Sequence, residues 1–235
     1  LAHTGKRPSP LDRTIFDIER EAFSSPQLVR LFTNSHMVRR DILSYYDWPE
    51  ERITVVHNGA PWHDCAEAFA ASSARSGPYH FLFVGHGFAR KGLAPLIKAL
   101  EGLPARLSVI GKDKNIRSYI RLARAHGLDA TFYGARSPLP FYQRADALVI
   151  PSLYDPFANV TVEALAMGLT VVSSRTNGGS EVLTDENGIV FDDLREALIA
   201  ALERPKTAER AERIRHSVAH LDLSSQVGAL IDACE

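Results

Sequence analysis

The 235-residue sequence has few cysteines and no long apolar stretch. Cys65 and Cys234 are its only cysteines, which excludes a disulfide scaffold and a cysteine-based zinc site. Two free cysteines also fit a reducing compartment. No apolar run approaches the roughly 18–20 residues of a membrane-spanning helix. We therefore expect a cytoplasmic protein with an ordinary hydrophobic core.

The sequence also lacks an excess of either charge and any local metal-binding pattern. It has 27 Lys and Arg against 28 Asp and Glu, so its net charge of −1 gives no reason to expect a nucleic-acid partner. The histidines show no metal-ligand spacing along the chain, and no D-x-D motif occurs. We expect no metal and no cofactor.

The alternation of elements divides the chain into four parts. Residues 1–59 read as helix, strand, helix and strand, the tail of an α/β domain, with Ser35 as the N-cap of the second helix and the second strand over residues 53–59. Residues 60–78 are rich in Ala and Ser and predict a linker with a short helix. Residues 79–204 alternate short β-rich runs with helices, and residues 205–235 are helical. This pattern predicts a doubly wound parallel sheet covered on both faces.

The stretch from Pro151 to Gly168 reads as a strand end, a loop and a helix. Asp155 and Glu163 stand eight positions apart across the start of that helix. Because the neighbours of Glu163 are apolar, its carboxylate needs hydrogen-bond partners from the protein or from a ligand such as a sugar. The alternative is a purely structural role, in which Asp155 is an N-cap or loop residue and Glu163 is a core residue hydrogen-bonded to the backbone.

A second candidate, GHGFARKG from Gly85 to Gly92, follows a strand and opens a helix. Arg90 and Lys91 would oppose the dipole at a helix N-terminus unless an anion such as phosphate joins them. A solvated basic turn remains the alternative. The segment is not a dinucleotide fingerprint, because Arg90 occupies the position of the third glycine. The later Gly178-Gly179 pair predicts a turn before a short helix from Ser180.

Five separated segments together resemble the C-terminal half of the retaining, nucleotide-sugar-dependent glycosyltransferases of family 4. The resemblance covers about residues 28–192, and RKG and GKDK make it most similar to the bacterial lipopolysaccharide-core glucosyltransferases. It implies an α/β GT-B fold, here a doubly wound Rossmann-like donor domain with a partial N-terminal α/β segment. The segments are VVHNGAP, FVGHGFARKGLAPLIKAL, LSVIGKDK, FYQRADALVIPSLYDPFANVTVEALAMGLTVVSS and NGGSEVL with ENGIVF.

The resemblance also implies roles for the site residues. Glu163 would bind the ribose of the donor, Asp155 would meet the hydroxyls of the transferred sugar, and Arg90 with Lys91 would neutralise the leaving diphosphate. Asp155 departs from the family's Glu at that position, which leaves the donor sugar open. The remaining substrate-binding candidates are the loop amides of Phe157, Ala158, Asn159 and Val160, the strand-end residues Gly85 and His86, and Gly134, Ala135 and Arg136 near the base.

The implied activity is transfer of a hexose from a UDP-glucose type donor, with retention of configuration. The acceptor would be a saccharide or a lipid-linked sugar in cell-surface or lipopolysaccharide synthesis. Contact with the inner membrane face would come through the rest of the N-terminal domain. Because the sequence begins at Leu1 and carries only part of that domain, we expect a fragment that binds nucleotide sugar but transfers it poorly. A sugar-nucleotide epimerase of the same fold and a non-catalytic nucleotide-binding fragment remain alternatives.

Overall fold

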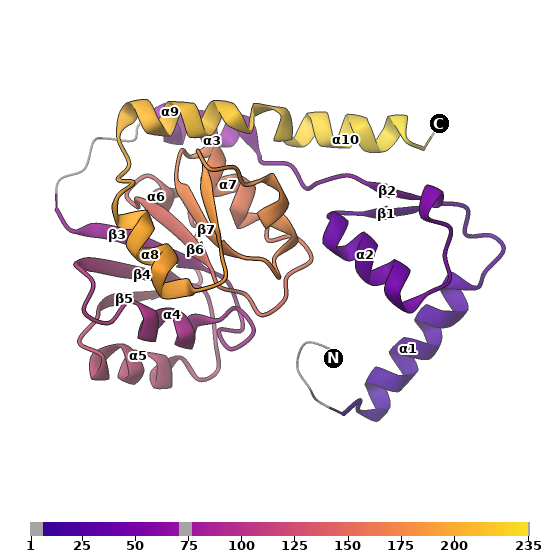
Figure 1. The fold of residues 1–235 in the computed structure, drawn as a ribbon, viewed down its shortest axis with the longest axis horizontal. Helices are drawn as coiled ribbons and strands as arrows, with labels where there is room; N and C mark the ends of the chain where they lie inside the picture. Colours follow the sequence, from indigo (N-terminus) through magenta and orange to yellow (C-terminus); the bar gives the residue numbers. More distant parts are fainter. Residues whose placement is uncertain (1–6, 71–76, 235) are drawn as a thin grey trace.

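The computed structural model describes residues 7–70 and 77–234 of the chain (Figure 1). Its first part is a small α/β unit in which two short strands pair in parallel. Ser35 caps the second helix there, because its hydroxyl accepts a hydrogen bond from the Val38 amide at 3.2 Å. The elements of this part are α1 Pro10–Phe23, β1 Leu31–Thr33, α2 His36–Tyr45, the 3₁₀ turn η1 Glu50–Arg52 and β2 Ile53–Val55.

The main sheet has six parallel strands in the order β5-β4-β3-β6-β7-β8, as the alternating pattern predicted. The chain winds outward from β3 to β5 and then returns to β6 on the other side of β3. Successive strands are thus added in opposite directions from the point between β3 and β6. Ligands of such sheets bind at that switch point, beyond the carboxyl ends of the strands. The strands are β3 Tyr79–Val84, β4 Ala105–Ile110, β5 Asp129–Gly134, β6 Ala147–Ile150, β7 Thr170–Ser174 and β8 Gly188–Phe191.

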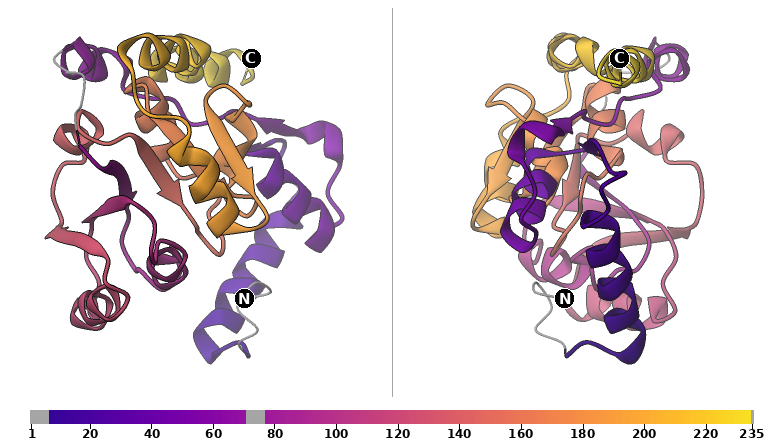
Figure 2. Two further views of the ribbon diagram at one scale, coloured as in Figure 1. Left: turned by 60° about the vertical axis from the view of Figure 1, so that its left-hand side comes forward. Right: turned by 90° about the vertical axis from the view of Figure 1, so that its right-hand side faces the viewer.

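Helices cover both faces of this sheet, as Figure 2 shows. Along β3, Phe81 and Phe83 point into one core cluster and Leu82 points into the other, because side chains alternate across a strand. The first cluster is covered by α4 Leu93–Ala99, α5 Ile116–Ala125 and α8 Leu194–Leu202. The second is covered by α3 Trp62–Ala70, α6 Leu139–Tyr142, α7 Val160–Ala166 and α9 Ala208–Ser217.

The C-terminal helices run along one edge of the molecule, α9 followed by α10 Leu223–Asp232, with the 3₁₀ turn η3 Ala219–Leu221 between them (Figures 1 and 2). The start of α10 is hydrogen-bonded to the segment after β2, since the Ala60 carbonyl accepts a bond from the Leu223 amide at 2.9 Å. Arg30 also donates to the Ala233 carbonyl at 2.8 Å. No helix within residues 7–70 and 77–234 is both long and apolar enough to cross a membrane.

The region expected to be a linker contributes to the core of the second cluster. Ala60 and Cys65 are buried there, and α3 packs against α6 and α7. Residues 71–76 of that region, like residues 1–6 at the start, lie outside the described residues. The boundaries proposed at residues 59, 78 and 204 remain predictions.

Candidate functional site

A cavity of about 480 Å³ opens at the switch point, beyond the ends of β3 and β6. Its volume lies within the range of about 300–1,000 Å³ that is usual for small-molecule sites. Nine of the candidates from the sequence line it, together with Asn34, Asn58, Val84 and Pro156. The nine are Gly85, His86, Arg90, Lys91, Asp155, Phe157, Ala158, Asn159 and Val160.

The charged centre of the cavity is formed by Arg90, Lys91 and Asp155. Lys91 donates a hydrogen bond to Asp155, and both side chains are largely buried. Arg90 is half-exposed, with a guanidinium nitrogen 3.9 Å from the same carboxylate and 3.1 Å from the Tyr154 carbonyl. The sequence predicts an anion beside Arg90 and Lys91, and in the structure the Asp155 carboxylate is that anion. A phosphate entering the cavity would share Lys91 with Asp155.

A glycine positions these cations. The sequence placed the start of the helix near Lys91, but α4 begins at Leu93 because Gly92 has a φ of 75° and interrupts the helix. A Cβ atom at Gly92 would lie 1.9 Å from the Pro151 carbonyl oxygen. Only glycine allows this left-handed turn and this close approach. The Arg90–Lys91 turn thereby packs directly against the end of β6.

The loop after β6 is held by Asn177, a residue that the sequence did not single out. The Asn177 side chain is fully buried and accepts hydrogen bonds from the Ala158 amide at 3.0 Å and the Gly179 amide at 3.1 Å. The Asp155 backbone pairs with the same segment through the Thr176 carbonyl at 2.8 Å. The Ala158 amide is thus occupied within the protein, and its expected role as a ligand donor remains a prediction. A buried Asn followed by two glycines after a strand is the signal for such a support.

The N-terminal unit supplies one wall of the cavity. Asn58 donates to the Asn159 side chain at 2.6 Å, and the Ser35 hydroxyl donates to the Pro156 carbonyl at 2.7 Å. Gly178 allows this approach, because a Cβ atom there would lie 2.5 Å from the Ser35 hydroxyl. Asn34 and Asn58 are lining residues that sequence reasoning missed. Both follow strands of the small unit, and that position was their only signal.

Glu163 lies one turn into α7 and is not among the lining residues of the cavity. The Tyr142 hydroxyl donates a hydrogen bond to its carboxylate at 2.9 Å. Burial raises the pKa of Glu163, and this bond from Tyr142 opposes that shift. The sequence left open whether the protein or a ligand supplies hydrogen-bond partners to Glu163, and the structure shows a partner from the protein, Tyr142. The contact with ribose remains a prediction.

Arg136 lies in a different cavity, of about 360 Å³, on the face of β4 and β5. Its Nε donates to the Tyr133 carbonyl at 3.1 Å, and the lining includes Arg106 and Arg144. Gly134 and Ala135 line neither cavity. The structure therefore does not place these three candidates in the cavity that Lys91 lines. Their place near the base remains a prediction.

Comparison with known proteins identifies the class of this fold and site. The sequence model of the family described as Glycosyl transferases group 1 matches residues 65–216, which is more than half of the chain. The chain belongs to this family, and its six-stranded parallel sheet with flanking helices is the fold expected from the resemblance.

Two curated relatives illustrate the similarity. An uncharacterized glycosyltransferase of Methanocaldococcus jannaschii, MJ1607, is 29% identical over 189 residues, covering 72% of this chain and 48% of that protein. A glycogen synthase of Mycobacterium tuberculosis is 32% identical over 234 residues, covering 90% of this chain and 54% of that protein. The chain spans about half the length of the curated relatives that it matches.

Two solved structures share the fold. WaaG, a glycosyltransferase involved in lipopolysaccharide biosynthesis, has a TM-score of 0.77 and 25% identity, over 94% of this chain and 67% of that chain. Anabaena HepE, solved in complex with UDP-glucose, has a TM-score of 0.76 over 96% of this chain and 69% of that chain. The identity to HepE is 17%, so this likeness concerns the fold.

Proposed function

We propose that the chain is the donor-binding part of a glycosyltransferase that moves a hexose from a nucleoside-diphosphate sugar to a saccharide acceptor. The observation that carries this proposal is the cavity at the switch point, where Arg90, Lys91 and Asp155 meet the loop 157–160. A cavity with two cations, one carboxylate and several polar groups suits a diphosphate attached to a sugar.

The proposed chemistry follows from charge. Departure of a nucleoside diphosphate leaves an oxocarbenium-like sugar and places negative charge on the phosphate oxygens. Arg90 and Lys91 would stabilise that charge in a partly buried site, where fixed charges contribute strongly to lowering the barrier. Asp155, next to Lys91, would contact sugar hydroxyls and keep the ammonium group oriented before the phosphate arrives.

The finer assignments rest on resemblance and on the neighbours. UDP-glucose is the proposed donor type because HepE was solved with UDP-glucose and the sequence resembles glucosyltransferases. A role in lipopolysaccharide or cell-surface glycan synthesis is proposed from the similarity to WaaG. Retention of configuration follows from the proposed membership of family 4, and same-face attack and double displacement are both compatible with it. The cytoplasmic location and the contact with the membrane face remain predictions.

Isothermal titration with UDP, ADP and GDP tests donor binding directly. We expect UDP to bind and Lys91→Ala to weaken that binding, because the substitution removes a charge-assisted contact with the diphosphate. Lys98→Ala is the matched control, since Lys98 lies exposed in the last turn of α4, the helix that follows Lys91. Equal affinities of the wild-type protein and Lys91→Ala would contradict the proposal. Absence of binding by all three nucleotides would favour a scaffolding role.

A further inference from the structure

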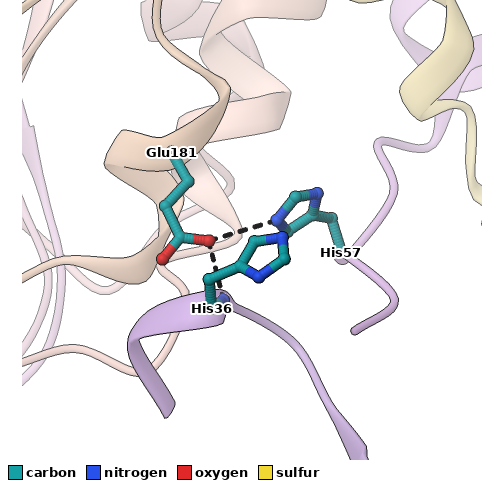
Figure 3. A group of neighbouring side chains, drawn as sticks. All are labelled: His36, His57 and Glu181. Atoms are coloured by element: carbon teal, nitrogen blue, oxygen red, sulfur yellow. Dashed lines mark hydrogen bonds and ion pairs between the residues drawn. The ribbon is translucent and has the colours of Figure 1, made fainter. Parts of the chain in front are cut away.

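A cluster of three potential metal ligands lies at the junction between the N-terminal unit and the donor domain (Figure 3). His36 is the first residue of α2, His57 follows β2, and Glu181 belongs to the 3₁₀ turn η2 Gly178–Val182. One ligand atom from each residue lies within 4.8 Å of the other two. His57 Nε2 is 3.3 Å from a carboxylate oxygen of Glu181. His36 and Glu181 are 145 positions apart, which is why spacing along the chain gave no sign of this group.

We propose that His36, His57 and Glu181 bind a zinc ion. Two imidazole nitrogens and one carboxylate oxygen are a ligand set that suits Zn²⁺, whereas Mg²⁺ and Ca²⁺ prefer oxygen ligands. Tetrahedral zinc holds its ligands about 2.0–2.2 Å away, so that neighbouring ligand atoms are about 3.4 Å apart. The pair His57–Glu181 already meets this spacing. A nitrogen of the exposed His36 ring lies within 4.8 Å of both atoms of the pair and would move closer on binding, and a water would complete the fourth position.

The surroundings orient the carboxylate for this role and also limit the affinity. Glu181 accepts hydrogen bonds from the amides of His36 at 2.7 Å and Met37 at 2.6 Å, which fix its position against the start of α2. An ionised carboxylate has about four acceptor sites, so two amides leave room for a metal. Such supporting bonds are typical of metal ligands in proteins. Arg40 lies 3.9 Å from Glu181 and opposes a cation, but its side chain is 69% exposed and water screens its charge.

A zinc ion here would connect two parts of the molecule beside the donor cavity. It would join α2 and the loop after β2 to η2. The turn η2 directly follows Asn177, whose side chain holds the loop after β6. The His57 ring also packs against Phe157, with ring centroids 5.7 Å apart, and Phe157 lines the cavity. The ion would therefore fasten the N-terminal unit against the donor domain and stiffen one wall of the cavity. This inference does not depend on the identity of the donor.

Titration of chelator-treated full chain with zinc chloride tests the proposal. We expect one zinc per chain, no binding of Mg²⁺ at equal concentrations, and a rise in Tm of about 5 °C or more at 100 times the Kd. His36→Ala should weaken zinc binding at least about 100-fold, because loss of even an outer partner of a metal ligand costs about 10–100-fold. His36 is an exposed residue, so its removal should preserve the fold, and circular dichroism would check this.

His216→Ala is the matched control. His216 is an exposed histidine 3.7 Å from the carboxylate of Glu212, and among the residues that the structure describes no third ligand joins this pair. The variant should bind zinc like the wild-type protein. The proposal is overturned if the wild-type chain takes up no zinc, in which case the His57–Glu181 contact serves only to dock the two units. It is equally overturned if folded His36→Ala binds zinc as tightly as the wild-type protein.

Discussion

Replacement of Lys91 by Met should destabilise the protein and weaken nucleotide binding at the same time. Asp155 is only 6% exposed, and without Lys91 its nearest described cation is Arg90 at 3.9 Å. Removal of one partner of a buried ion pair costs about 3–5 kcal/mol. Arg90 is half-exposed and already 3.9 Å from this carboxylate, so its charge partly replaces that of Lys91 and we expect a smaller loss of about 2–3 kcal/mol. For a chain of this size that loss corresponds to a decrease in Tm of about 4–12 °C.

The double variant Lys91→Met/Asp155→Asn separates the two effects. Because it removes both charges, most of the lost stability should return, which denaturant unfolding would measure as a coupling energy in a double-mutant cycle. UDP binding should not return. A contact between a charged donor and phosphate contributes about 1.5–3 kcal/mol, so both variants should bind UDP about 10–100-fold more weakly than wild type.

Two results would refute this reasoning. If Lys91→Met unfolds at the same denaturant concentration as the wild-type protein, the Lys91–Asp155 pair does not stabilise the turn before α4. If the double variant recovers full UDP affinity, Lys91 makes no phosphate contact and acts only by neutralising Asp155. Lys98→Met, on the exposed side of α4, should change neither quantity.

Three further predictions concern stability and its dependence on pH. Gly92→Ala should destabilise the fold by more than about 2 kcal/mol, because its Cβ would lie 1.9 Å from the Pro151 carbonyl oxygen. Gly102→Ala is the comparison: its φ is also positive, at 72°, but nothing lies within 4 Å of the added Cβ. This variant should therefore cost only the backbone strain of about 1–2 kcal/mol. Asn177→Ala should lower the free energy of unfolding in urea by about 2–3 kcal/mol, because the buried amides of Ala158 and Gly179 lose their acceptor. For the same reason it should weaken UDP binding. Unchanged UDP binding by the folded variant would contradict the role of Asn177 in holding the loop after β6. Burial lowers the pKa of Lys206 from 10.5 to about 8, so at this residue the unfolded chain binds more protons than the native chain between these pH values. The stability of the wild-type protein relative to Lys206→Met should therefore rise by about 3 kcal/mol from pH 8 to pH 10.5 in urea unfolding, and an unchanged difference would contradict this.

Much of the fold could be predicted because its signals are local. Regular alternation of short apolar runs with amphipathic segments predicted the parallel sheet, and Ser35 was recognised as the cap of α2. Boundaries were less accurate where tertiary contacts decide them. The strand expected over residues 53–59 ends at Val55, and α4 begins after Gly92, whose positive φ interrupts the helix.

The candidate site was predictable where its residues follow strand ends and not where it depends on distant partners. Arg90, Lys91 and Asp155 were found because they lie beyond β3 and β6. Their mutual pairing could not be predicted, since 64 positions separate Lys91 from Asp155. The supporting role of Asn177 and the separate cavity of Arg136 also depend on how loops turn in space, which periodicity does not encode.

The most direct test of the account is a crystal structure of this chain with UDP. We predict the diphosphate in the 480 Å³ cavity, within hydrogen-bond distance of Lys91 and Arg90. Diphosphate bound instead in the cavity of Arg106, Arg136 and Arg144 would contradict the central claim.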